Sequence, residues 1–440
     1  MQNKASKTEP GRQLRGTLVP REYLWPFILL TSLFAFWGVA NNMTDVLLAT
    51  FKKIMSMSDF QTSWIQIAFY GSYFCLALPA AIFIRRFSYK SGVMLGLGLF
   101  AAGALLFFPA SQTMVYGHFL VALFILAGGL SILETSANPY AIAMGPEASA
   151  TRRLNLAQSF NPLGSITGVI LGKLFILSGL NEASTEERAQ MAPEQLQQMQ
   201  EAELAAVMGP YVTIAFIIVG VWILFAVTKF PRASDQETSV NLLPTLRRLL
   251  GRPHYVKGVI AQFFYVGAQI GVWSFTIRYV MNELEMNEAS AANYYLASIL
   301  LFSASRFVCT ALMKILSPQR LLSIMAAGAC VFTLLVVLVG GQVGAVALVG
   351  VSGCMSLMFP TIYGIAVEGL GEDAKIGASG LVMAILGGAV LTALQGQVSD
   401  LAGIHVAYLV PLGCFLIILY YGMRGSRVQT PDDQRIAGAS

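Results

Sequence analysis

The chain has 440 residues, of which 56% are hydrophobic and only 12% are charged, and its mean hydropathy is +0.65. Soluble domains carry about twice that fraction of charge, so the composition excludes a soluble globular protein and predicts an integral membrane protein. The net charge of +5 does not indicate nucleic-acid binding, because the basic residues lie in short segments between apolar runs.

Twelve apolar runs of about 20 residues follow one another along the chain, and each is long enough to cross about 30 Å of hydrocarbon. The first six occupy residues 24–51, 60–84, 92–110, 114–145, 154–180 and 207–229. The second six occupy residues 255–281, 291–315, 319–339, 343–368, 376–400 and 405–423. The sequence therefore predicts an all-α membrane protein with twelve transmembrane helices.

The two sets of six runs show signs of an internal repeat. Gly129 precedes Pro139 by ten residues in the fourth run, and Gly350 precedes Pro360 by ten in the tenth. A repeat of six helices, with a site between the halves at mid-membrane, is typical of secondary transporters. We expect an N-terminal tail (1–23), an N-terminal six-helix bundle (24–229), a linker (230–254), a C-terminal six-helix bundle (255–423) and a C-terminal tail (424–440).

Basic residues gather in the segments that follow every second run. They include Arg85, Arg86, Lys90, Arg152, Arg153, Arg247, Arg248, Arg252, Lys257, Arg320 and Arg424. The connections on the other side hold STEERAQMAPEQLQQMQEAE and NELEMNE, which are rich in Glu and Gln. The positive-inside rule therefore predicts that both termini are cytoplasmic, although Lys52 and Lys53 run against it.

Polar side chains form stripes within three runs of the first half. They are Asn41, Asn42 and Asp45 in the first run, Glu134 and Asn138 in the fourth, and Asn155, Gln158 and Asn161 in the fifth. Residues three or four apart share one helix face, and such a face does not contact acyl chains. The stripes either line a cavity or hydrogen-bond between helices, and for the amides both alternatives stay open.

The two carboxylates indicate a function more specifically than the amides do. No Lys or Arg lies at a matching depth in the first half, so Asp45 and Glu134 are either protonated or in a wet cavity. A buried carboxyl without a counter-charge suits a group that binds and releases protons. We therefore predict that Asp45 and Glu134 couple transport to protons.

In the second half, the residues at the corresponding depth are polar or aromatic but carry no charge. Met355 stands in the tenth run where the Gly–Pro spacing places Glu134 in the fourth. The seventh run holds Gln262, Tyr265, Gln269 and Trp273, and the eighth begins with Asn293 and Tyr294. Aromatic rings together with amides and hydroxyls suit the binding of a neutral polyol. Helix packing, or a belt of aromatic residues at the membrane interface, also explains the aromatic residues. We expect Arg306, nearer the cytoplasmic end, to be a gate or packing residue.

The histidines and cysteines do not indicate a metal or redox site. His118, His254 and His405 are not spaced as metal ligands, and the five cysteines form no CxxC pair. No nucleophile–base constellation is evident. We expect no metal, no cofactor and no enzymatic activity.

The chain resembles the major facilitator superfamily, and within it the fucose–galactose–glucose proton symporters, from about Arg21 to Met423. The resemblance rests on VANNMTDVLL, SYKSG, ETSANP, GPE, RLNLAQSFN, AQFFYVGAQ with WSF and IRY after it, AANYY and FPTIY. It implies two bundles that rock around a central site in a bacterial cytoplasmic membrane. The implied partners are a proton, a neutral monosaccharide and membrane lipids, without nucleic acid, and we expect a monomer.

The resemblance also implies roles for single residues. Asp45 and Glu134 match the family's protonated acids, and Asn42, Gln158 and Asn161 match its sugar-binding amides. The polar and aromatic pattern adds Asn138, Tyr265, Gln269 and Asn293 as candidates for sugar contact, and the resemblance adds Phe359. Fucose-type members carry Gln-Tyr before the proline of the tenth helix, where this chain has Met358 and Phe359. We expect L-fucose–proton symport, and another hexose such as glucose or galactose, an uncoupled facilitator and a sugar sensor remain alternatives.

Overall fold

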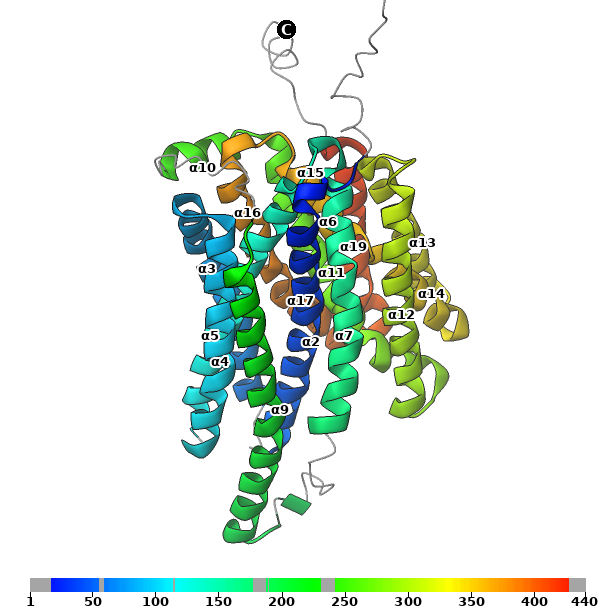
Figure 1. Cartoon of the computed structure of the whole chain (residues 1–440). Coiled ribbons are helices and arrows are strands. Elements are labelled where there is room, and N and C mark those ends of the chain that lie inside the picture. Colours follow the sequence, from blue (N-terminus) through cyan, green and yellow to red (C-terminus); the bar gives the residue numbers. More distant parts are fainter. Residues whose placement is uncertain are drawn as a thin grey trace, which may run out of the picture.

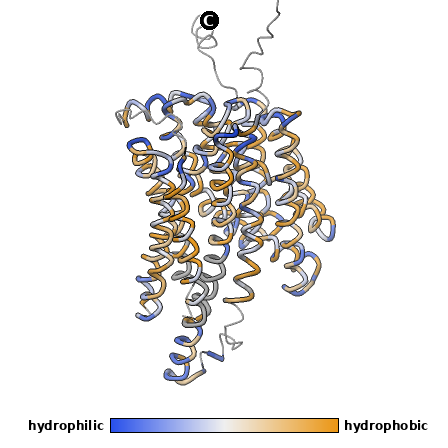
Figure 2. The backbone as a smooth tube through the Cα atoms, viewed as in Figure 1, coloured by the Kyte–Doolittle hydropathy of each residue, from blue (hydrophilic) through white to orange (hydrophobic). Residues whose placement is uncertain are grey.

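The computed structural model describes residues 17–54, 59–113, 115–176, 187–188, 190–230 and 242–426. Every regular element within these ranges is helical, and the long helices run side by side (Figure 1). Figure 2 shows that hydrophobic residues occupy the middle of the helices and hydrophilic residues gather at their ends. Among the described residues, ten spans are long and apolar enough to cross a membrane, and Val212–Val227 forms a shorter apolar helix.

The helices of the first half form the N-terminal bundle. They are α2 (Leu24–Ile54), α3 (Asp59–Arg86), α4 (Tyr89–Thr113), α5 (Tyr116–Ala143), α6 (Ala150–Gln158), α7 (Phe160–Leu171) and α9 (Pro193–Val227). Short elements accompany them: η1 (Arg21–Tyr23), η2 (Glu147–Ser149) and the π-helical turn η3 (Gly172–Ile176). The pair α6 and α7 is the fifth predicted transmembrane helix, interrupted at Ser159.

The helices of the second half form the C-terminal bundle. They are α11 (Pro253–Leu284), α12 (Glu288–Leu312), α13 (Pro318–Leu338), α14 (Gly341–Met355), α15 (Met358–Val367), α16 (Ala374–Met383), α17 (Gly387–Ala402), α18 (Ile404–Ala407) and α19 (Leu409–Tyr420). The short turns η5 (Gly371–Asp373), η6 (Ala384–Leu386) and η7 (Tyr421–Gly425) precede α16, join α16 to α17 and extend α19. The tenth, eleventh and twelfth predicted helices are therefore each built from two or more segments.

Two elements differ from the sequence prediction. Helix α9 begins at Pro193 rather than near residue 207, because a proline at the first helical position is followed by good helix formers, EQLQQMQEAELAA. The linker predicted at 230–254 contains a further helix, α10 (Leu242–Leu250). Its leucines recur at helical spacing beside Arg247 and Arg248, so it is an amphipathic surface helix (Figure 1).

Matching glycines bring the first and fifth helices of each bundle into backbone contact. A Cβ added to Gly164 of α7 would lie 1.9 Å from the carbonyl oxygen of Ala35 in α2. One added to Gly387 of α17 would lie 2.0 Å from the carbonyl oxygen of Phe263 in α11. Small residues let transmembrane helices approach this closely. The equivalent contact in both bundles supports the internal repeat.

Proline explains why two of the helices are interrupted. A proline inside a helix cannot bond the carbonyl four residues earlier and clashes with it. Pro162 therefore frees the carbonyl of Gln158, where α6 ends, and Pro360 frees the carbonyl of Ser356, between α14 and α15. In a membrane such carbonyls need a partner from a neighbouring helix.

The two bundles meet at the end of the molecule where α10 lies, called here the α10 end (Figure 1). Asn155, in the second half of α6, donates to the Thr361 hydroxyl of α15 across 3.2 Å. The ammonium of Lys375, at the start of α16, lies 5.0 Å from the ring centroid of Tyr89, at the start of α4. These contacts join the parts of the helices nearest α10. The structure is thus closed at the α10 end.

We expect Gly164→Ala to destabilise the protein, because the new methyl group overlaps the Ala35 backbone and overpacking costs about 1–3 kcal/mol. Gly220→Ala in α9 is the matched control, since nothing lies within 4 Å of its added Cβ. Thermal unfolding in detergent should show a lower midpoint for Gly164→Ala and an equal or higher one for Gly220→Ala. Equal midpoints for both variants would contradict the close packing of α2 and α7.

Candidate functional site

Two of the predicted polar stripes meet in the N-terminal bundle. The amide nitrogen Nε2 of Gln158, in α6, donates to Oδ1 of Asn138, in α5, across 2.8 Å. Both side chains are buried, and Glu134 lies one turn from Asn138 on the same helix. The stripes of the fourth and fifth helices therefore form one polar surface.

This surface contains polar atoms that no protein group satisfies. Within the described part of the chain, Oε2 of Glu134 and Nδ2 of Asn138 are enclosed and have no hydrogen-bond partner. Glu134 is 9% exposed, and no ion pair with it is found among these residues. Enclosed polar atoms without partners are costly and rare in folded proteins. Such atoms mark a surface suited to a ligand, a proton or water.

The first helix contributes less than the sequence predicts within the described residues. Nδ2 of Asn42 donates to the carbonyl of Gly38 across 3.2 Å, a bond within α2. Nδ2 of Asn161 donates to the carbonyl of Phe34 across 3.2 Å, which ties α7 to α2. The side chains of Asn41 and Asp45 lie outside the residues whose side chains the structure describes.

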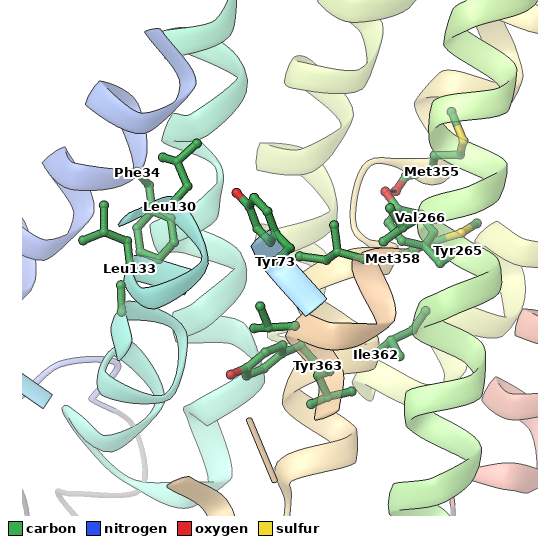
Figure 3. Packing of buried hydrophobic residues seen from close by; sticks show 14 of the residues in the cluster. Phe34, Tyr73, Leu130, Leu133, Tyr265, Val266, Met355, Met358, Ile362 and Tyr363 are labelled. Carbon is green, nitrogen blue, oxygen red and sulfur yellow. Dashed lines mark hydrogen bonds between the residues drawn. The ribbon is translucent and has the colours of Figure 1, made fainter. Parts of the chain in front are cut away.

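The C-terminal bundle presents aromatic side chains around the break between α14 and α15. The Tyr265 hydroxyl donates to the carbonyl of Met355 across 3.1 Å, and its ring centroid lies 6.3 Å from that of Phe359. Phe359 is half-buried and stacks on Tyr363, with ring centroids 6.4 Å apart. Figure 3 shows Tyr265 beside Met355 at this break. The pair Tyr265 and Phe359 predicted from the sequence is thus brought together.

Two other predicted residues of this bundle lie apart from that pair. Gln269 is half-buried, one turn along α11 from Tyr265. Asn293 is exposed in the first turns of α12, beside Tyr294, which exchanges hydrogen bonds with Gln342 at the start of α14. Asn293 therefore lies near the end opposite α10.

Arg306 connects the two bundles through the carbonyls that the prolines free. Its Nη1 donates to the carbonyl of Gln158 across 3.0 Å, and its Nε donates to the carbonyl of Ser356. The guanidinium carbon lies 4.5 Å from the ring centroid of Phe302, and the residue is 3% exposed. Arg306 is thus a buried packing residue at the contact between the bundles, and its role as a gate stays a prediction.

One buried polar residue escaped the sequence analysis. Tyr363, in α15, is fully buried, and its hydroxyl has no partner among the described residues. Its spacing of four residues from Phe359 places it on the same helix face and was the available signal. Gln262, noted in the sequence as polar, is also fully buried, with both amide atoms unpartnered within the described ranges.

Comparisons with known proteins identify the family. The sequence profile of the Major Facilitator Superfamily matches residues 28–393. The chain belongs to the major facilitator superfamily. The predicted fold class, all-α with twelve transmembrane helices in two pseudo-symmetric six-helix bundles, is confirmed by this membership and by the structural match below.

The relatives within the superfamily are sugar transporters. The chain is 40% identical over 427 residues to the L-fucose-proton symporter of Haemophilus influenzae, covering 94% of this chain and 100% of that protein. It is 33% identical over 412 residues to the glucose/galactose transporter of Brucella abortus, covering 92% and 95%. The crystal structure of FucP, a major facilitator superfamily transporter in the outward conformation, matches with a TM-score of 0.88 at 42% identity, covering 93% of this chain and 100% of that one. The family resemblance predicted from the motifs is confirmed.

We expect Arg306→Met to loosen the contact between the bundles, because two buried carbonyls lose a charged donor and each such bond contributes about 1.5–3 kcal/mol. A cysteine placed at Thr361, in a variant without the native cysteines, should then react at least about tenfold faster with a polar maleimide. Arg278→Met is the control, because Arg278 also stacks on a ring, that of Phe275, but is exposed. An unchanged rate in Arg306→Met would show that Arg306 does not hold the α10 end closed.

Proposed function

We propose that the chain carries L-fucose together with protons across the bacterial cytoplasmic membrane by alternating access. The structural observation that supports this most is the buried, unpaired carboxyl of Glu134 beside the bonded amides of Asn138 and Gln158. A carboxyl without a basic partner suits protonation and release, while amides bind the hydroxyls of a neutral sugar. The name of the Haemophilus influenzae relative supports L-fucose as the sugar.

We infer the orientation from charge. Arg85 donates to Thr245 of α10, and Arg248 of α10 forms an ion pair with Asp373 at 2.7 Å. Arg and Lys side chains therefore gather at the α10 end, which the positive-inside rule makes cytoplasmic. In that orientation the cytoplasmic end is closed and the site opens outward, in agreement with the outward conformation of the matching FucP structure.

In the proposed transport cycle, each predicted group acts according to its chemistry. Glu134, and Asp45 as its predicted partner in function, take protons while the site faces outward. Asn138, Gln158, Asn42 and Asn161 offer amides to the sugar hydroxyls, and the rings of Tyr265 and Phe359 cover its apolar face. Gln269, and Asn293 nearer the outer end, contact the sugar along its entry path. The bundles then part at the α10 end, and sugar and proton leave to the cytoplasm.

The same charge rule makes the tails predicted at 1–23 and 424–440 and the linker predicted at 230–254 cytoplasmic, next to the bundles predicted at 24–229 and 255–423. Both bundles needed for alternating access belong to one chain, which favours a monomer surrounded by lipid. The relatives are transporters rather than enzymes, and the proposed cycle requires no cofactor.

A second candidate is symport of glucose or galactose. Phe359 supports it, because its half-buried ring offers no hydroxyl where fucose-type relatives are implied to carry one. The Brucella abortus relative is named a glucose/galactose transporter. L-fucose leads because the identity to the fucose symporter is higher, 40% against 33%.

We expect Glu134→Gln to uncouple transport. The amide keeps the size of the carboxylic acid but binds no proton, so counterflow of labelled sugar should persist while accumulation against a gradient disappears. For each coupled proton, a pH difference of one unit can drive about tenfold accumulation. The measurement is uptake into proteoliposomes under an inward proton gradient, with Glu368→Gln at the end of helix α15 as the matched control. Accumulation by Glu134→Gln at the wild-type level would refute the assigned role.

We expect Phe359→Tyr to distinguish the two sugars. If L-fucose is the substrate, the added hydroxyl can form one more hydrogen bond, which contributes about 0.5–1.5 kcal/mol, or up to about tenfold in affinity. In a site built for another hexose, the same hydroxyl loses water without gaining a partner, and binding of that hexose weakens. Isothermal titration with L-fucose, galactose and glucose measures this. Unchanged affinity for all three sugars would place Phe359 outside the binding site.

A further inference from the structure

A carboxyl and an imidazole meet at the end of the C-terminal bundle opposite α10. Nε2 of His405, in α18, contacts Oε1 of Glu283, in the last turn of α11, within ion-pair distance. Oε2 of the same carboxyl accepts the backbone N–H of Gly341, at the start of α14, across 2.6 Å. Nδ1 of His405 lies 3.3 Å from the carbonyl oxygen of Val336, in the last turn of α13. The pair therefore joins the ends of four helices.

The turn between α13 and α14 leaves room for this pair. Gly340 has a φ of +66°, and a Cβ there would lie 2.6 Å from Oε2 of Glu283 and 2.8 Å from Cε1 of His405. Tyr279 donates to the same Val336 carbonyl across 2.8 Å, and its ring centroid lies 5.3 Å from that of His405. The Glu283 side chain is 11% exposed and the His405 side chain 38%. The carboxyl is thus held in place, while the imidazole is reached by water.

The contacts of His405 determine how many protons the pair holds. A carbonyl oxygen and an ionised carboxylate only accept hydrogen bonds, and a neutral imidazole has one N–H to donate. Both ring nitrogens of His405 face such oxygens. Either His405 is the imidazolium and donates to both, or Glu283 is the protonated acid and donates to Nε2. In both cases the pair holds one proton more than a neutral imidazole and an ionised carboxylate together.

The other titratable groups at this end do not replace that proton. Tyr279 gives its hydroxyl hydrogen to the Val336 carbonyl, and Tyr408 packs on the Tyr279 ring with centroids 5.2 Å apart. The remaining charged side chains at this end of the C-terminal bundle are exposed, and within the described ranges they bond to neither member of the pair: Arg278, Glu285, Glu288 and Asp400.

We propose that Glu283 and His405 form a proton-binding site, separate from Glu134, that holds together the ends of α11, α13, α14 and α18. Without the proton, a ring nitrogen without hydrogen faces the carboxylate or the Val336 carbonyl, and one of the two contacts is lost. The site lies at the end opposite α10, which is outside in the inferred orientation. Protons outside the cell therefore stabilise the outer end of the C-terminal bundle. The proton site itself does not depend on symport.

The proposal predicts how stability changes with pH. Free imidazole loses its proton at about pH 6.5, so above that pH the unfolded chain holds no proton here while the folded pair keeps one. Stability is therefore lost as the pH rises. The unfolding equilibrium constant should increase by up to about tenfold for each pH unit above about 7, until the folded pair also loses its proton. The measurement is equilibrium unfolding of the whole chain in mixed detergent micelles, across the range from about pH 6 to 9.

Glu283→Gln removes the need for the proton but keeps the contacts. The amide N–H can donate to the neutral Nε2 of His405, and the amide oxygen can accept from Gly341. This variant should lose the extra pH dependence, so at about pH 9 its unfolding constant should be the smaller one. His118→Gln is the matched control, because His118 is exposed at the same end and its Nδ1 contacts the Thr113 hydroxyl at 2.7 Å. A hydroxyl both donates and accepts, so that ring needs no extra proton, and the control should keep the wild-type pH dependence.

The outcomes separate the proton site from symport. The same pH dependence of unfolding in wild type and Glu283→Gln would overturn the site. Should Glu283→Gln fold poorly, His405→Gln replaces it, because its amide donates to the ionised Glu283 without an added proton and should also lose the pH dependence. Glu283→Gln should still accumulate sugar under an inward proton gradient. Loss of accumulation in the folded variant would overturn the separation from Glu134, whereas accumulation by Glu134→Gln refutes the proposed coupling and leaves this site standing.

Discussion

The structure depends on one guanidinium that serves both bundles. Pro162 and Pro360 each free a carbonyl in a part of the protein that lipid and protein shield from water, and Arg306 donates to both. A buried arginine is costly without acceptors, and a buried carbonyl is costly without a donor. Each group therefore stabilises the other only while the bundles touch. The closed α10 end follows from satisfying polar groups, and opening it requires water to replace those bonds.

The two bundles differ in their buried polar side chains, although their backbones are arranged as a repeat. Gly164 and Gly387 produce equivalent close contacts in the two halves, so the scaffold is symmetric. The buried acid stands on α5, while α14 carries the apolar Met355 at the matching depth. In the proposed symport, the charge that changes during transport is thus confined to one bundle.

The sequence predicts those features that depend on local pattern. Twelve apolar runs define the helices, because crossing hydrocarbon requires about 20 apolar residues whatever their neighbours. The stripe containing Glu134 and Asn138 follows from helical spacing, and the bond to Gln158 agrees with a shared polar surface. The sequence predicts a connection before residue 207 because this segment is polar, yet polarity does not prevent a helix that extends beyond the membrane. Helix α10 is not predicted by the apolar runs either, because its pattern is amphipathic rather than apolar.

Tertiary contacts determine those features that the local sequence pattern does not predict. Nothing local distinguishes the arginine at 306 from any other basic residue near a helix end. Its role follows from prolines more than 50 positions before and after it on the chain, which no helical period connects. In the sequence, Tyr363 is indistinguishable from an aromatic core residue, and only the packing of α15 shows that its hydroxyl is enclosed. The resemblance implies a hydroxyl at the position of Phe359 in fucose-type relatives, whereas this chain carries one a turn deeper. A hydroxyl at that depth is fully enclosed rather than open to a ligand, so it does not take the place of the hydroxyl that Phe359 lacks.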